Sequence, residues 1–368
     1  MGKIKVLIVE DSAFMRKLIQ NFLSEDQNIE VIGIARNGQD AINKIKKWNP
    51  DVVTMDVEMP VMSGLEALEI IMRECPVPVI MLSSLNDQSA DRTLQAMQHG
   101  AFDFIAKPSG PISLDLHKIK EQLIEKIKAA GKIDIQLLQK KLNLPNYSQD
   151  VRLSYSKMEL KERLVPEDGI QMNNRKLVAI GTSTGGPRAL QSVLTMLPKD
   201  FSLPIVIVQH MPPGFTKSLA SRLDQLSEIS VKEAEDGDVL EKGTAYLAPG
   251  GYHLKVEGNG TILKIALSKD EVRNGHRPSV DVMFESISLV KHLSTIAVVM
   301  TGMGSDGTKG LALIKENQPA VCIAESEETS IVFGMPKSVI GAKLADTVEH
   351  VENIADAILR YAELKGAF

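Results

Sequence analysis

A serine in a glycine-rich turn is the first candidate for chemistry in this sequence. The run 181–187 (GTSTGGP) lies between an apolar segment and an amphipathic one, and it fits the pattern G-x-S-x-G. A serine on such a strand-to-helix turn exposes its Oγ, and the N–H groups at the helix start are available to a developing oxyanion. A phosphate-binding turn and a simple glycine-rich connection are the alternatives. The dinucleotide fingerprint G-x-G-x-x-G does not fit, because Ser183 occupies its second glycine.

A histidine and an aspartate follow two other apolar runs of the same region. His210 comes after 203–209, and Asp306 lies in 302–307 (GMGSDG) after the run 296–301. A serine nucleophile needs a base to remove its proton, and a neutral imidazole needs a carboxylate to fix its tautomer. Taken alone, His210 fits a structural histidine and Asp306 a turn residue. Together with Ser183 they predict a catalytic triad.

Polar side chains also follow four of the five apolar runs in the first third of the chain. Glu10 and Asp11 follow the first run, Asp56 the third, Ser83 the fourth and Lys107 the fifth. The carboxyl ends of parallel strands line the ligand crevice of an open sheet, so these groups should converge. Such a cluster suits Mg²⁺, with Asp56 as a phosphoryl acceptor beside it. The alternative is that each acid is a helix N-cap or a solvated loop residue.

This arrangement resembles the response-regulator receiver domain over residues 1 to about 125. The motifs that carry the resemblance are 10–12 (EDS), 55–60 (MDVEMP) with Gly64, and Lys107-Pro108. The resemblance implies a flavodoxin-like fold, in which Ser83 and Lys107 contact the phosphoryl oxygens and Phe104 is the switch aromatic. It also implies that four groups hold Mg²⁺: Glu10, Asp11, Asp56 and the backbone carbonyl of Glu58.

The second half of the chain resembles a different family. In the α/β-hydrolases the acid precedes the histidine, whereas here His210 precedes Asp306, so another hydrolase family is needed. Residues 176 to about 360 are similar to the chemotaxis protein-glutamate methylesterases. The matching runs are GTSTGG at 181–186, QHMPPGF at 209–215, HRPSVD at 276–281, TGMGSDG at 301–307 and VFGMP at 332–336.

This second resemblance implies an activity, partners and residue roles. Ser183 would attack the γ-methyl ester of a glutamate on a methyl-accepting chemoreceptor, with His210 as general base and Asp306 orienting it. The backbone N–H of Met303, with that of Thr184 or Gly185, would hold the oxyanion. Selected receptor glutamines would be deamidated, a chemotaxis histidine kinase would be the phosphodonor, and hydrolysis would need no cofactor. We expect three residues of the run 276–281, His276, Arg277 and Asp281, to form a structural ion-pair and turn cluster.

The elements that must position these residues alternate between β-branched runs and helix-length amphipathic segments. We predict an α/β fold with two doubly wound parallel sheets: a receiver at 1–128, a linker at 129–174 with one short helix near 135–142, and a catalytic domain at 175–368. Five strands are expected in the receiver, at 5–9, 29–34, 51–55, 77–82 and 102–106. Glycine-rich breaks between 231 and 268 predict a β-hairpin insertion in the catalytic domain.

Composition excludes several classes of protein. The 368 residues carry 42 Lys and Arg against 47 Asp and Glu, and this net charge of −5 argues against nucleic acid as the main partner. The apolar runs are far shorter than the roughly 20 residues of a membrane span, so direct membrane insertion is not expected. Two cysteines do not make a disulfide framework, which favours the cytoplasm. The alternatives to a receptor methylesterase are a receiver-controlled regulator that binds DNA or another partner, and a hydrolase acting on another methylated receptor-like protein.

Overall fold

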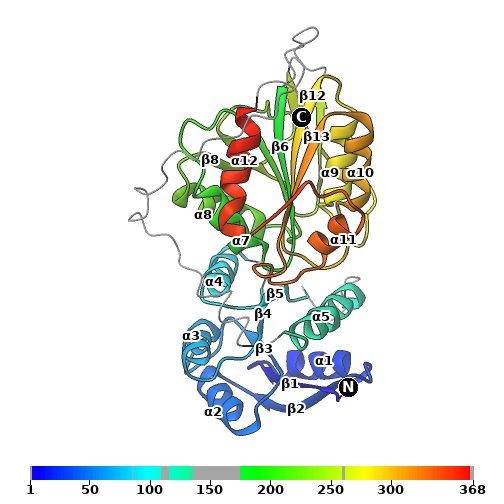
Figure 1. Cartoon of the computed structure of the whole chain (residues 1–368). Coiled ribbons are helices and arrows are strands. Elements are labelled where there is room, and N and C mark those ends of the chain that lie inside the picture. Colours follow the sequence, from blue (N-terminus) through cyan, green and yellow to red (C-terminus); the bar gives the residue numbers. More distant parts are fainter. Residues whose placement is uncertain are drawn as a thin grey trace.

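The computed structural model describes residues 2–84, 86–108, 116–133, 135, 175–258 and 262–364. Within these ranges the chain forms two α/β units, which Figure 1 shows one above the other. The N-terminal unit is built on a five-stranded sheet and the C-terminal unit on a seven-stranded sheet. The predicted pair of parallel α/β domains is therefore confirmed.

The sheet of the N-terminal unit is parallel throughout and has the strand order β2-β1-β3-β4-β5. Its elements are β1 (Ile4–Val9), α1 (Ala13–Ser24), β2 (Ile29–Ala35), α2 (Gly38–Trp48), β3 (Val52–Asp56), α3 (Gly64–Glu74), β4 (Val79–Ser83), α4 (Asp87–Gln98), β5 (Asp103–Ala106) and α5 (Leu116–Ala130). Side chains of β1 alternate between two cores: Leu7 and Val9 pack under α2, α3 and α4, whereas Val6 and Ile8 pack under α1 and α5. Both faces of the sheet are thus buried, as its β-branched runs predict.

The sheet of the C-terminal unit is also parallel throughout, with the order β14-β13-β12-β6-β7-β9-β8. Its elements are β6 (Arg175–Thr182), α7 (Gly186–Leu194), β7 (Ile205–Gln209), α8 (Phe215–Leu226), β8 (Ser230–Glu233), β9 (Thr244–Leu247), β10 (His253–Gly258), β11 (Leu263–Ser268), α9 (Val280–Ser288), β12 (Leu293–Val299), α10 (Thr308–Asn317), β13 (Ala320–Glu325), α11 (Met335–Gly341), β14 (Thr347–Glu349), η2 (Val351–Asn353) and α12 (Ile354–Glu363). From β6 the chain first builds β7 and later returns to β12 on the opposite side of β6. A ligand crevice is expected at such a switch point.

The expected hairpin region is only partly a hairpin. The strands β10 and β11 form the antiparallel pair, in a sheet of their own. The strands β8 and β9 instead pair in parallel in the main sheet. The segment between them, 234–243, runs along β11, where Leu240 N–H donates to the Leu263 carbonyl at 2.9 Å, before it returns to the sheet. Its glycines therefore bend a crossover connection and do not make a tight turn.

Prolines and buried polar residues account for the shifted strand boundaries. We expected β4 to begin at residue 77 and β7 at residue 203, but they begin at Val79 and Ile205, directly after Pro78 and Pro204. A proline has no N–H to donate to a neighbouring strand. The strand expected at 296–301 begins earlier, at Leu293, because the polar residues at 294 and 295 are also buried in the sheet.

The two units share an apolar junction. Helix α4 of the N-terminal unit packs against α7 and α8 of the C-terminal unit. The rings of Phe104 and Phe215 stack across the junction with 4.7 Å between their centroids, and the side-chain amides of Gln98 and Gln191 are hydrogen-bonded at 3.1 Å. Apolar clusters from both units merge there into one core. Each sheet carries candidate chemistry at one end, and the two units that contain these sheets are thus packed against each other.

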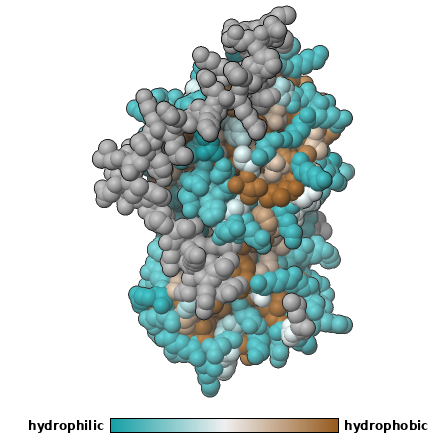
Figure 2. All heavy atoms as spheres, viewed as in Figure 1, coloured by the Kyte–Doolittle hydropathy of each residue, from teal (hydrophilic) through white to brown (hydrophobic). Residues whose placement is uncertain are grey.

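The segment expected as a linker lies almost wholly outside the described residues, as does the short helix near 135–142. Helix α5 continues to Ala130, two residues beyond the expected end of the receiver. Within the described ranges, no helix combines the length and apolar character needed to cross a membrane. The face seen in Figure 2 is mostly hydrophilic, with smaller areas of apolar atoms.

Candidate active site and phosphoacceptor pocket

The candidate nucleophile lies on a tight turn between β6 and α7. Gly185 has φ of +82° and occupies the position before the first residue of α7, Gly186. A side chain at Gly186 would clash with Gln209, because its Cβ would lie 1.9 Å from the Gln209 Oε1. The turn GTSTGG therefore needs glycines both for a left-handed backbone and for close packing. It presents Ser183 at the carboxyl end of β6, as the G-x-S-x-G pattern predicts.

A second glycine-rich loop packs directly against Ser183. The Cβ of a side chain at Gly302 would lie 2.8 Å from the Ser183 Cβ, so only glycine fits there. This contact places Met303, the next residue, beside the nucleophile. The N–H groups of Met303, Thr184 and Gly185 donate to no acceptor among the described residues. These are the three N–H groups that the sequence predicts for an oxyanion.

The imidazole of His210 and the carboxylate of Asp306 are in direct contact. Their Nε2 and Oδ2 atoms are 2.8 Å apart, and their side chains are 5% and 2% exposed. Asp306 also accepts hydrogen bonds from the side chains of Asn274 and Ser279, and from the backbone N–H of Val280 and Asp281 at the start of α9. Burial alone would raise the pKa of Asp306. The bonds from His210, Val280 and Asn274 outweigh burial and hold this pKa well below its ordinary value.

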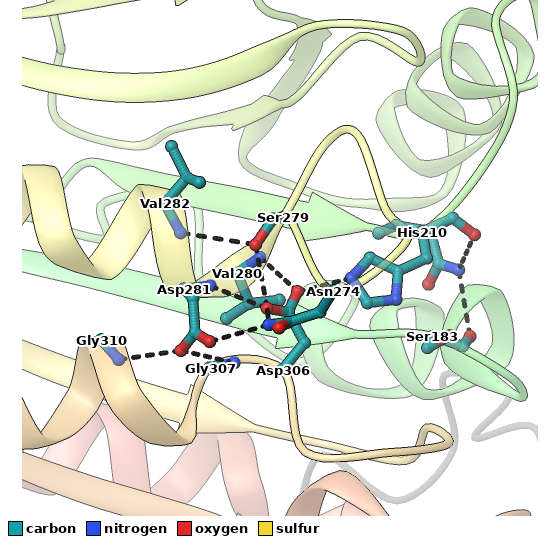
Figure 3. A network of polar contacts seen from close by, with 11 residues as sticks. Ser183, His210, Asn274, Ser279, Val280, Asp281, Val282, Asp306, Gly307 and Gly310 are labelled. Carbon is teal, nitrogen blue, oxygen red and sulfur yellow. Dashed lines mark hydrogen bonds and ion pairs between the residues drawn. The ribbon is translucent and has the colours of Figure 1, made fainter. Parts of the chain in front are cut away.

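The ring of His210 lies between the acid and the nucleophile. Figure 3 shows its Nε2 directed to Asp306 and its other side toward Ser183. The Nδ1 atom is buried and has no hydrogen-bond partner among the described residues. The structure thus joins His210 to Asp306 and leaves Nδ1 open on the side of Ser183, without a hydrogen bond between serine and histidine. Such bonds are often long before substrate binds.

Three residues that support this arrangement were not predicted from the sequence as part of the site. The amide of Gln209 donates to the backbone carbonyls of Ser183 and His210, at 3.0 and 3.2 Å, and so connects the ends of β6 and β7. Asn274 and Ser279 donate to Asp306, each at 2.9 to 3.0 Å. The dipeptide Asn-Gly at 274–275 is a strong turn signal and would have indicated a defined loop there.

The residues of the run 276–281 make hydrogen bonds where an ion pair was expected. Asp281 accepts from the N–H groups of Gly307 and Gly310, at 3.0 and 2.8 Å, and so holds the loop that carries Asp306. Arg277 donates to two backbone carbonyls, both at 2.9 Å. His276 lies flat against His210.

The acidic pocket of the N-terminal unit is assembled as the strand ends predict. Carboxylate oxygens of Glu10, Asp11 and Asp56 lie within 4.8 Å of one another. The ammonium of Lys107 is 2.9 Å from the Glu10 carboxylate and 2.7 Å from that of Asp56. Burial, with the nearby charge of Asp56, raises the pKa of Glu10 to about 7. Burial also raises the pKa of Asp56, although Lys107 opposes the shift.

These residues fit a hard divalent cation. Three carboxylates face one ammonium, so the pocket carries excess negative charge when all three are ionised. Burial, and after it the charge of Asp56, raises the pKa of Glu10, so a cation that binds there would favour its ionised form. Mg²⁺ prefers carboxylate oxygens and keeps several waters, which the exposed carboxylate of Asp11 permits. The N–H of Glu58 also points into the pocket and donates to the Asp56 Oδ1 at 3.3 Å.

The hydroxyl of Ser83 makes its hydrogen bonds to groups other than Asp56. Its hydroxyl is fully buried, accepts from the Thr93 hydroxyl at 2.7 Å and lies 3.3 Å from the Ser89 carbonyl, both on α4. Phosphoryl contact through Ser83 would therefore require its hydroxyl to leave α4. Phe104, the expected switch aromatic, lies in the junction against Phe215.

A hydrogen bond across the junction reaches the residue next to the nucleophile. The hydroxyl of Thr184 donates to the carboxylate of Asp103 at the start of β5, and this carboxylate also pairs with Lys126 of α5. Thr184 and Asp103 are both buried, at 3% and 4% exposure. The N-terminal unit thus lies against the turn that carries Ser183.

Comparison with known proteins assigns both units. Residues 6–118 match the family described as response regulator receiver domain, and residues 178–358 match the family described as CheB methylesterase. The protein-glutamate methylesterase/protein-glutamine glutaminase of Halalkalibacterium halodurans is 52% identical, over 98% of this chain and 98% of its own. That of Geobacillus kaustophilus is also 52% identical, over 98% and 99%. The crystal structure of the Thermotoga maritima CheB methylesterase catalytic domain is 48% identical and covers 51% of this chain and 98% of its own, with a TM-score of 0.49. The chain belongs to the family of the protein-glutamate methylesterases/protein-glutamine glutaminases, in which a receiver domain precedes the CheB methylesterase domain.

Proposed function

We propose that this chain is a phosphorylation-activated serine hydrolase that removes γ-methyl groups from glutamates of methyl-accepting chemoreceptors. The products are glutamate and methanol, and selected receptor glutamines are deamidated at the same site. The observation that carries the proposal is the convergence of Ser183 with the bonded pair His210 and Asp306 at three neighbouring strand ends. This hydrolysis resets receptor methylation and so supplies chemotaxis adaptation.

The contacts of His210 assign its two nitrogens. When Nε2–H donates to Asp306, Nδ1 carries the lone pair and is the base on the side of Ser183. Nδ1 takes the Ser183 proton while Oγ attacks the ester carbonyl, and Asp306 stabilises the imidazolium. The N–H of Met303, with that of Thr184 or Gly185, holds the oxyanion.

Collapse of the tetrahedral intermediate completes the acyl transfer. The bond to the methoxy oxygen breaks, His210 returns the proton to it, and methanol leaves a glutamyl ester on Ser183. Water then attacks this ester with His210 again as base, and Ser183 is released with its proton. For a glutamine substrate the leaving group is ammonia, so the same residues serve both reactions.

The receiver supplies the control. We propose that Asp56 accepts a phosphoryl group from a chemotaxis histidine kinase, and that its oxygens are contacted by Lys107 and by Ser83, whose hydroxyl leaves its partners on α4 to do so. Glu10, Asp11, Asp56 and the backbone carbonyl of Glu58 would hold Mg²⁺, which neutralises charge on the transferred group when bound. A kinase that draws on ATP implies a cytoplasmic location, and the net charge of −5 supports a protein partner in place of nucleic acid.

The short strand β5 joins the phosphoacceptor pocket to the catalytic turn. Lys107 follows β5 and binds Asp56, whereas Asp103 begins β5 and binds Thr184. A phosphoryl group adds roughly two negative charges at Asp56 and draws on the same Lys107 ammonium. We infer that this change loosens the junction and opens the site. We also infer that the receiver extends from residue 1 to the end of α5 at Ala130, that a linker follows up to residue 174, and that the catalytic domain spans 175–368.

Methanol release from methylated receptors tests the proposal most directly. Wild-type chain should release methanol, faster after treatment with a phosphodonor and Mg²⁺, and Ser183→Ala should release almost none. Ser192→Ala is the matched control, because this serine lies on the following helix α7 and donates only to a carbonyl of that helix. A wild-type chain that binds receptor or DNA without releasing methanol would instead support a binding regulator.

A further inference from the structure

We propose that His276 is a positioning residue for the reaction: its imidazole covers one face of the His210 ring and stabilises the imidazolium that forms there. The inference rests on the proposed hydrolysis by Ser183 and His210. It assigns His276 a role through His210, and no contact with the substrate.

The two imidazoles are stacked. Their centroids are 3.8 Å apart and their planes differ by 10°, so the rings overlap almost face to face. Asp306 occupies the Nε2 edge of the His210 ring, and the Nδ1 edge is directed to Ser183. The two faces of the ring are therefore the surfaces on which another residue can support it. A ring in this place hinders rotation of His210 away from the plane in which Nδ1 meets Ser183.

A tight turn delivers His276 to this position. Arg273 and His276 exchange backbone hydrogen bonds of 3.0 and 2.9 Å around Asn274 and Gly275. Both central residues have positive φ, +53° and +80°, as a type I′ turn requires. The Asn274 amide donates to Asp306 at 3.0 Å and to Asp281 at 2.9 Å. One turn therefore fixes the acid with one side chain and covers the base with another.

The charges around the stack favour a neutral His276 beside a cationic His210. Burial, together with the neighbouring His210, lowers the pKa of His276 to about 3. Asp306, on the loop between β12 and α10, acts on His276 and on His210, and Asp281 of α9 acts on Asp306. The charge of Lys126 from the receiver also acts on His276 and lowers its pKa. A neutral aromatic face attracts a cation held against it. His276 thus lowers the free energy of the imidazolium without adding a charge of its own.

A shape-only role predicts a different outcome from an aromatic role. Leucine fills much of the same volume as histidine and excludes water, but it has no π face. Phenylalanine keeps a flat aromatic face and has no group that transfers a proton. The pair His276→Leu and His276→Phe therefore separates packing, aromatic support and direct proton transfer.

The experiment measures kcat/KM for methanol release against pH in full-length chain activated by phosphodonor and Mg²⁺. His276→Phe should retain most of the wild-type rate and the wild-type acid limb. His276→Leu should lose roughly 2- to 30-fold in kcat/KM, and its acid limb should move to lower pH by about 0.4 to 1.5 units, because the imidazolium has lost its aromatic support. His350→Leu, at an exposed histidine, is the control, and circular dichroism checks that each variant is folded.

Three results would overturn the inference. A His276→Leu profile equal to that of wild type removes any role, and a loss of rate with no shift of the acid limb leaves only packing. Equal, severe losses in both variants indicate that His276 itself transfers a proton. A wild-type chain without methanol release would refute the proposed function, whereas these three results refute only the role of His276.

Discussion

Replacing Thr184 by valine should partly activate the unphosphorylated enzyme. The substitution keeps the β-branched shape and removes only the hydroxyl that donates to Asp103 across the junction. Asp103 keeps Lys126 as a partner, so the variant does not leave a buried carboxylate unpaired. In the open form the Thr184 hydroxyl bonds to water. The substitution therefore removes the hydrogen bond to Asp103 from the closed form alone.

The size of the effect follows from the nature of this bond. A hydrogen bond to a charged group contributes about 1.5 to 3 kcal/mol. Loss of that free energy shifts the equilibrium toward the open form by roughly 10- to 150-fold. Since the basal rate of a mostly closed enzyme follows its open fraction, basal methanol release should rise by up to this factor. The ceiling is the rate of a fragment beginning near residue 174, which lacks the receiver.

The assay compares initial rates of methanol release with and without a small phosphodonor and Mg²⁺. For Thr184→Val the unphosphorylated rate should rise, while the phosphorylated rate stays within a few-fold of wild type. Thr195→Val is the control. It removes a hydroxyl at the end of α7 that donates to the Gln191 carbonyl of the same helix at 2.8 Å. Equal losses in both states would show that Thr184 acts in catalysis, and an unchanged basal rate would refute the reasoning.

Three further predictions concern the two sites. His210→Ala and Asp306→Ala should each reduce turnover severely, and the double variant should be little worse than His210→Ala, because the residues act as a unit; multiplied losses would count against the triad. Mg²⁺ should raise the melting temperature of the receiver more at pH 8 than at pH 5. The pKa of Glu10 is about 7 in the folded chain against an ordinary 4.5, so without a cation the fold loses stability as pH rises between these two values. Above that range a bound cation can replace the lost proton. Equal shifts at both pH values would contradict this. Asp56→Asn should abolish phosphoryl labelling and keep the basal rate of methanol release; undiminished labelling would place the acceptor elsewhere.

Sequence periodicity predicted most of the fold because both sheets are buried on two faces. Continuous apolar runs such as 5–9 and 203–208 indicate central strands of a parallel sheet, because both faces of such a strand are covered by other elements. The parallel pairing of β8 with β9 was missed, since glycines between two strands mark a bend but do not say whether the chain turns back at once. That choice depends on the contact of 234–243 with β11, which is a tertiary interaction.

The same distinction separates predicted from missed site residues. Ser183, His210 and Asp306 follow strands of one parallel sheet, and the topology itself gathers such positions at one edge. His276 and Asn274 belong to a turn outside that sheet, so no strand register places them. The contact of Thr184 with Asp103 depends on how two domains pack, and neither residue carries a local signal of it.

The junction lies beside the edge strand of the receiver sheet. The strand β5 is an edge strand, and an uncovered edge presents unpaired backbone groups. The catalytic domain packs on α4, and two side chains of β5 also reach it: Asp103 accepts from Thr184 and Phe104 stacks on Phe215. Lys107 lies only four residues from Asp103, a distance of about 13 Å along an extended strand. A signal at Asp56 therefore needs no long relay: the strand whose end senses the phosphoryl group is also the strand that holds the residue beside Ser183.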